Sequence, residues 1–388
     1  MDIASPLGDV GFHDAALYRV QMTAPSEQVI AATGIAITRT VAADGWAALT
    51  YVMGPAREFT LNLSPRFQTE EAAAYGARVI SCFLPEDAAA SRSALYDAVA
   101  ALEVYSDQFG PYPYREMAVV QAPLTFHGME FPGLNLIGSQ AYNKYLTDLE
   151  TLVVHEVAHQ WWYNQVGSDQ TQNPWLDEGL AEFSMYFYFL GRHGQPAADL
   201  LRLQRWEAAV AANAQRGLDA PIGRPVLEYK RDAYETIVYG KGALFFATLR
   251  DEMGEQAFCK LLRTYVERFR WRTAARPTSG CWRRRSREES WGACSGGGWR
   301  RASRVSLLFA GFAIDKRPAS DTMKSNKDWQ AMSLSHFQEG LDNDDDAVYD
   351  SWRAHYQELA IDKRGASDAM KSSRGAGSSS CRTTRERP

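Results

Sequence analysis

Residues 155–159 read His155-Glu156-Val157-Ala158-His159, and after eighteen intervening residues the chain reaches Glu178. Two histidines four positions apart lie about one turn from each other on the same face of an α-helix. Their ring nitrogens can bind one metal ion at about 2.0–2.1 Å, and a carboxylate from a second helix can supply the third ligand. Three protein ligands leave one position open for water, which is typical of a catalytic zinc site.

The residues around this stretch favour two helices. The apolar run Asp148–Val154 reads as the opening of the first, with Thr147 as its N-cap and Glu150 completing a capping box. Pro174 stands directly before the second helix, where proline suits a helix start. Glu156 follows the first ligand and is placed to act as a general base for the water. The alternative is a structural histidine pair in a helix.

These motifs resemble a known family. His155–Trp162 and Pro174–Phe183 look like the aminopeptidase N family of gluzincin zinc metallopeptidases. The resemblance runs from near the N-terminus to about Phe269 and is strongest between 109 and 246. It implies a thermolysin-like catalytic domain, one zinc ion and peptide substrates.

A second motif lies upstream, in the segment His127–Leu134. The family places a Gly-x-Met-Glu-Asn segment on an edge strand beside the metal, where its glutamate binds the free α-amine of the substrate. The resemblance assigns this role to Glu130, with Gly128 and Met129 beside it. Phe131 departs from the commonest family version, which has Asn there, and resembles a bacterial subgroup. A solvated turn residue is the alternative for Glu130.

A third motif lies downstream, in Tyr234–Ala243. It resembles the family's Tyr-x-Lys-Gly segment, whose tyrosine donates a hydrogen bond to the oxyanion, and Tyr239 is in register with it. A core phenol is the alternative. Glu182 lies one turn past Glu178 and is a candidate partner for the outer nitrogen of His155; an exposed helical glutamate is the other interpretation.

Composition agrees with an enzyme and narrows little else. The chain has 388 residues, 45% of them hydrophobic, and can bury a substantial core. Its net charge of −5 gives no reason to expect nucleic acid or an anionic membrane as a partner. The five cysteines follow no metal-ligand spacing.

We expect an α+β fold in three parts. Residues 1–65 read as short strands and resemble the last portion of a longer β-rich domain. Residues 66–271 form the zinc peptidase domain, with a small mixed sheet and helices that include Ala88–Phe109, Thr147–Val166 and Lys241–Phe269. Neither a signal peptide nor a transmembrane segment is recognisable, and the cytoplasm is the default compartment.

Residues 272–388 are expected to be an irregular tail. From Cys281 to Arg304 the sequence is dominated by Arg, Ser, Gly, Trp and Cys. We interpret this bias as a frameshift or gene-joining error just after Trp271, with an arginine-rich nucleic-acid arm as the alternative. A thirteen-residue segment, Ala313–Ser325, recurs nearly unchanged at Ala360–Ser372. Two copies are too few to define a repeat architecture.

The sequence thus predicts a zinc metallopeptidase that removes N-terminal residues from peptides. Two alternatives stay open. One is an endopeptidase, or another amide hydrolase of the same fold, because Phe131 changes the amine-binding motif. The other is a truncated product without activity.

Overall fold

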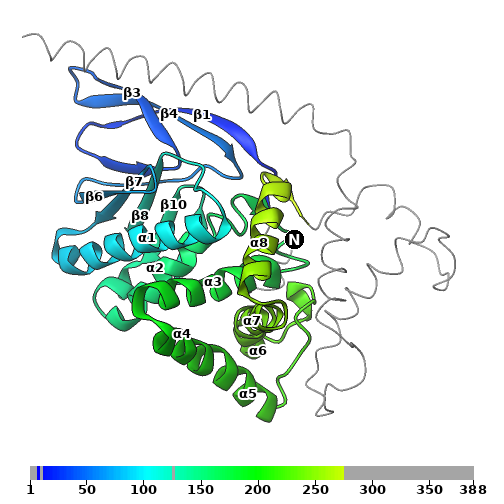
Figure 1. Ribbon diagram of the computed structural model, residues 1–388. Helices are drawn as coiled ribbons and strands as arrows, with labels where there is room; N and C mark the ends of the chain where they lie inside the picture. The colour runs from blue at the N-terminus through cyan, green and yellow to red at the C-terminus, as the bar shows by residue number, and fades with distance from the viewer. Residues whose placement is uncertain (1–6, 9–11, 125–126, 275–388) are drawn as a thin grey trace, which may run out of the picture. The chain divides into compact units, whose positions relative to one another are not determined.

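The computed structural model describes residues 7–8, 12–124 and 127–274, all within one compact unit (Figure 1). The chain begins with the short strands β1 (Ala16–Pro25), β2 (Val29–Ala32), β3 (Ile35–Val41), β4 (Trp46–Ala56) and β5 (Leu61–Ser64). They form an antiparallel sheet of order β1-β4-β3 and an antiparallel pair of β2 with β5. The expected β-rich start of the chain is therefore confirmed.

A second sheet supports the site. Its strands are β6 (Gln68–Ala74), β7 (Ala77–Phe83), β8 (Glu116–Ala122), β9 (Gly128–Phe131) and β10 (Leu134–Gly138), in the order β6-β7-β8-β10-β9. β7, β8 and β10 are parallel neighbours, whereas β6 and β9 pair antiparallel at the two edges. The sheet is therefore mixed, as predicted, and the motif containing Glu130 lies on an edge strand.

Helices follow and stack below this sheet (Figure 1). They are α1 (Ala88–Phe109), α2 (Leu149–Ala158), α3 (Trp175–His193), α4 (Gln195–Leu201), α5 (Ala208–Gln215), α6 (Arg231–Glu235), α7 (Gly242–Met253) and α8 (Glu255–Phe269). Two π-helical segments interrupt the series: η4 (Arg202–Glu207) between α4 and α5, and η6 (Thr236–Lys241) between α6 and α7. Such segments often occur at functional sites.

Strand β8 lies between the N-terminal strands and the helices. Met117 and Val119 belong to the main core with α1 and α2, whereas Ala118 and Val120 join a smaller cluster with Ala31 of β2. Successive side chains of a strand point to opposite faces, so β8 is buried on both sides. The N-terminal strands thus cover one face of the mixed sheet and the helices cover the other.

Two predicted helices differ from the structure, one at its ends and one in its interior. The helix expected over Thr147–Val166 spans only Leu149–Ala158, and Thr147 does not cap it, because Asp148 is the N-cap. After Ala158 the chain turns, and Tyr163 adopts a φ of 98°, which no helix continues through. The helix expected over Lys241–Phe269 is divided at Gly254, whose φ is 80°.

Arg57 joins three distant parts of the chain. It is 1% exposed, and its guanidinium donates to the carbonyl oxygens of Tyr163 at 2.6 Å, His13 at 2.7 Å and Arg272 at 2.8 Å. Beside it the short parallel pair β11 (Val166–Gly167) and β12 (Arg272–Thr273) forms. Arg57 therefore holds the last described residues of the chain against the N-terminal strands.

Most of the predicted irregular tail, including the arginine-rich segment and the repeated segment, lies outside the described residues. The helices that the structure does describe include none long and apolar enough to cross a membrane.

Candidate metal centre

Three ligand atoms converge where α2 meets α3. Nε2 of His155 lies 3.1 Å from Nε2 of His159 and 3.2 Å from Oε2 of Glu178, and the third side of the triangle is 3.3 Å. A tetrahedral zinc with bonds of about 2.0–2.1 Å requires ligand atoms about 3.3 Å apart. All three residues are buried, so the predicted ligands meet in a geometry that fits one ion.

The chemistry of these atoms also fits a cation. Nδ1 of His159 lies 3.0 Å from the carbonyl oxygen of Trp162, so that nitrogen carries the hydrogen. Nδ1 of His155 lies 3.3 Å from Oε2 of Glu182, within ion-pair distance although its angle is outside ideal hydrogen-bond geometry. With hydrogens on both Nδ1 atoms, both Nε2 atoms present lone pairs. Together with the Glu178 oxygen they make three acceptors facing one point.

Protons compete with a cation at this point. Burial lowers the pKa of His155, but the hydrogen bond to Glu178 and the close contact with the Glu182 carboxylate outweigh it and raise the pKa to about 9. Burial raises the pKa of Glu178, and the hydrogen bonds and charges of both histidines then bring it far below its ordinary value. A metal must displace the histidine protons, so its affinity rises with pH.

Glu156 lies beside the ligands and is 5% exposed. Burial raises the pKa of its carboxyl to about 8, with further contributions from Glu130 and Glu178. A bound divalent cation would lower this value again. The carboxylate rests against the backbone of Gly128, where an added β-carbon would overlap it. This close contact gives a structural reason for glycine at position 128.

Glu130 reaches the same point from the edge strand. It is 8% exposed, and ligand atoms of Glu130, Glu156 and His159 all lie within 4.8 Å of one another. Because side chains alternate along a strand, Met129 points to the face opposite Gly128 and Glu130. The structure therefore brings Glu130 to the ligands and turns the Met129 side chain away from it.

Tyr239 lies on η6, and its hydroxyl donates a 2.6 Å hydrogen bond to Oε1 of Glu178. Its ring stacks on His155, with ring centroids 5.7 Å apart. Two glycines permit this approach, because Gly179 of α3 and Gly242 of α7 face each other. A β-carbon on either would lie 3.1 Å from backbone of the other, which is tighter than ordinary packing.

Glu182 is not an exposed helical residue but is 1% exposed beneath His155. Besides its contact with Nδ1 of His155, it accepts hydrogen bonds from Arg205 and, at 2.8 Å, from Nε1 of Trp206. Both donors come from η4. Their link to the metal ligands could not be read from sequence spacing, because it depends on how η4 packs on α3.

Sequence reasoning also missed two buried amides that follow the second histidine. Asn164 donates from Nδ2 to the carbonyl oxygen of Glu130 at 2.8 Å. Gln160 donates to the carbonyl oxygen of Phe131 at 3.0 Å and accepts from the amide of Gly133 at 2.8 Å. The signal available was a run of Gln and Asn in an otherwise apolar segment, since buried amides require partners.

The part of the chain that carries this site is similar to known proteins. Residues 93–279 match the Peptidase family M1 domain. Endoplasmic reticulum aminopeptidase 1 of Mus musculus is 27% identical over 207 residues, which cover 50% of this chain and 22% of the mouse protein. Aminopeptidase N of Oryctolagus cuniculus is 29% identical over 172 residues, which cover 42% of this chain and 16% of the rabbit protein.

Solved structures show the same fold. The M1 zinc metallopeptidase from Deinococcus radiodurans superposes with a TM-score of 0.54 at 23% identity, covering 68% of this chain and 59% of that one. The chain therefore spans about a fifth of the length of the curated relatives and about three fifths of the solved structure.

Proposed function

Residues 93–279 belong to peptidase family M1, as the motifs predicted, and we propose that the protein is a zinc-dependent aminopeptidase. The observation that carries this proposal is the buried Glu130 carboxylate, which the edge strand places beside the candidate metal ligands. A carboxylate at that point can bind a cationic α-amine through a charge-assisted contact. The scissile bond would then lie one residue away, next to the metal.

His155, His159 and Glu178 would hold the single zinc ion. When bound, zinc polarises a carbonyl and lowers the pKa of water from 15.7 toward about 7. Glu178 would offer Oε2 to the ion, since its other oxygen accepts the hydrogen bond from Tyr239. Glu182 would keep His155 in the tautomer that leaves Nε2 free to bind.

Glu156 would act as the general base. Its carboxylate takes a proton from the attacking water and later delivers one to the leaving amine. Burial supports this role because it makes the carboxylate more basic than one in water. The contact with Gly128 fixes the position from which it acts.

Tyr239 would stabilise the oxyanion that develops at the scissile carbonyl. Its hydroxyl already lies in the site, 2.6 Å from Glu178, and can redirect its hydrogen bond to a substrate oxygen. A donor that is in place before the reaction stabilises developing charge without reorganisation.

An endopeptidase remains the competing candidate, because Phe131 replaces the usual Asn. The packing favours the aminopeptidase, since the Phe131 ring joins the apolar cluster on the far side of the sheet, together with Ala31 and Leu134. The substitution therefore leaves Glu130 on the metal side of the strand.

The deciding experiment uses aminoacyl arylamides with free and with acetylated amines. We expect hydrolysis of the free-amine substrates only, loss of activity with a chelator and recovery with zinc. Equal hydrolysis of the acetylated substrates would establish the endopeptidase alternative. Purified protein that neither binds zinc nor melts cooperatively would establish the inactive product.

The same assay tests the base. Glu156→Ala should abolish turnover and keep stoichiometric zinc, while Glu103→Ala, at an exposed position on α1, should behave as wild type. Turnover by a zinc-loaded Glu156→Ala variant would remove Glu156 from this role.

A further inference from the structure

A buried carboxylate connects the metal ligands to a π-helical segment. Oε2 of Glu182 faces Nδ1 of His155 at 3.3 Å, and Oε1 accepts from Nε1 of Trp206 at 2.8 Å. The guanidinium of Arg205 binds both oxygens, with Nη2 to Oε2 at 3.2 Å. Glu182 is thus held from one side by η4 and presented to His155 on the other.

The π-helical turn makes this double contact available. Arg205 and Trp206 are consecutive, yet both reach Glu182. A π-helix has a wider turn than an α-helix, which brings neighbouring side chains closer in direction. The other π-helical segment, η6, supplies Tyr239 to Glu178, one turn away on α3. Glu178 and Glu182 of α3 therefore each accept a hydrogen bond from a residue of a π-helical segment.

Burying a carboxylate without a counter-charge is costly. Glu182 is 1% exposed, whereas the Arg205 side chain is 43% exposed. Arg205 therefore supplies a positive charge from the solvent side without itself being deeply buried. If Glu182 turned away, Nδ1 of His155 would lose the acceptor that fixes its tautomer.

We propose that Arg205 and Trp206 are positioning residues for the metal centre. Acting through Glu182, they hold the His155 ring so that Nε2 faces the ion, and they thereby raise the affinity for zinc. This role goes beyond the proposed peptidase activity, since it concerns metal affinity and applies whatever substrate the site takes.

The test measures the dissociation constant for zinc by competition with a chelator of known affinity, together with the visible spectrum of the cobalt-substituted protein. Loss of a partner of a metal-bound histidine typically weakens metal binding by about 10–100-fold, and we expect this of Glu182→Gln. Arg205→Met acts one step further away and should weaken binding by about 3–10-fold. Arg205→Lys should keep most of the wild-type zinc affinity. Trp206→Phe should lower the zinc affinity less than Arg205→Met does.

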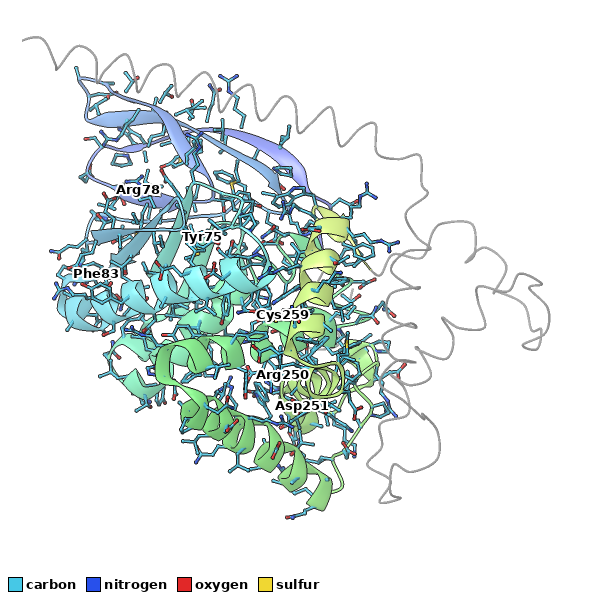
Figure 2. All side chains as sticks on the ribbon, in the orientation of Figure 1. Tyr75, Arg78, Phe83, Arg250, Asp251 and Cys259 are labelled. Carbon is cyan, nitrogen blue, oxygen red and sulfur yellow. The ribbon has the colours of Figure 1, made fainter. Side chains whose placement is uncertain are left out.

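Arg202→Met is the matched control. Arg202 lies on the same π-helical segment and forms ion pairs with Glu207 and with Asp251 of α7, the latter labelled in Figure 2, rather than with Glu182. The thermal stability of this variant should fall less than that of Arg205→Met, because these ion pairs are solvent-exposed, while zinc affinity and the cobalt spectrum stay as in wild type.

The proposal fails if Arg205→Met and Trp206→Phe both bind zinc as tightly as wild type while Glu182→Gln does not. It also fails if Arg202→Met weakens zinc binding as much as Arg205→Met, because the effect would then be one of general stability. Trp206→Phe removes the N–H donor together with the five-membered ring of a fully buried indole and keeps one aromatic ring, so it gives a second test of the contact if Arg205→Met folds poorly. Wild-type protein that binds zinc but hydrolyses no peptide would contradict the proposed function and leave this proposal standing.

Discussion

The backbone of Gly128 lies against the Glu156 carboxylate with no room for a β-carbon between them. Gly128→Ala should therefore push the carboxylate out of place while leaving the zinc ligands intact. General base catalysis is worth about 10²–10⁴-fold, so we expect kcat to fall by roughly 10²-fold or more. The test measures kcat and the zinc content of Gly128→Ala on the same preparation.

Gly223 provides the control for that variant. An added β-carbon there meets nothing within 4 Å, and its backbone needs no left-handed conformation. Gly223→Ala should have wild-type kcat. If Gly128→Ala also kept full activity, Glu156 could not be held where the structure places it.

The hydrogen bond from Tyr239 to Glu178 gives a second prediction. Tyr239→Phe removes the hydroxyl but leaves Oε2 of Glu178 to bind the ion. We expect kcat to fall by about 10²–10³-fold with zinc content unchanged, as for removal of one oxyanion donor. Tyr234→Phe, at a ring 6.4 Å from that of Tyr239, should cost far less. Equal losses of kcat in the two variants would indicate that Tyr239 has a packing role and no catalytic one.

Asn164 ties the edge strand to the turn after the metal-binding helix. Asn164→Ala would leave the Glu130 carbonyl oxygen without its buried donor, at a cost of about 1–3 kcal/mol in the free energy of unfolding. Because Glu130 is the proposed amine site, KM for free-amine substrates should rise more than kcat falls. Gln172→Ala, at an exposed amide nearby, is the control. A fall in kcat with unchanged KM would contradict the prediction.

The sequence predicted those features of the fold and the site that depend on residues close together along the chain. The i, i+4 spacing of His155 and His159 places both rings on one helical face whatever surrounds them. The helix Ala88–Phe109 was predicted to the residue, because its apolar positions recur at helical spacing and Gly110 ends it. Glu130 and Tyr239 required the family resemblance, since nothing local shows that they reach the metal ligands.

What the sequence did not predict depends on tertiary contacts. The turn after Ala158 requires Tyr163 at a positive φ, and its carbonyl oxygen is held by Arg57 from 106 positions away. Strand β3 is exposed at every position after Ile35, so no alternation of buried and exposed residues marks it and its pairing with β4 defines it. The Arg205 contact with Glu182 likewise exists only once η4 has packed on α3.

A cluster of acidic groups away from the metal provides a prediction on pH. Burial, followed by the charge of Glu150, raises the pKa of Asp97 from 3.8 to about 6. Tyr188 donates to both carboxylates, at 3.2 Å to Asp97 and 2.9 Å to Glu150. A carboxyl with a raised pKa binds its proton more tightly in the folded state. Its contribution to stability is therefore present below about pH 4 and lost as pH rises through 6.

Asp97→Asn should remove that dependence, because the amide cannot ionise and still accepts from Tyr188. Asp97 is partly exposed, so solvent screens part of the effect, and we expect the variant to be about 1 kcal/mol more stable at pH 7.5. Near pH 4 the advantage should vanish. Urea unfolding of both proteins from pH 4 to 8 measures the difference in their free energies of unfolding. Any effect of metal loss is common to both proteins and cancels in this difference. A difference that does not change with pH would show that Asp97 titrates normally and that Glu150 does not raise its pKa.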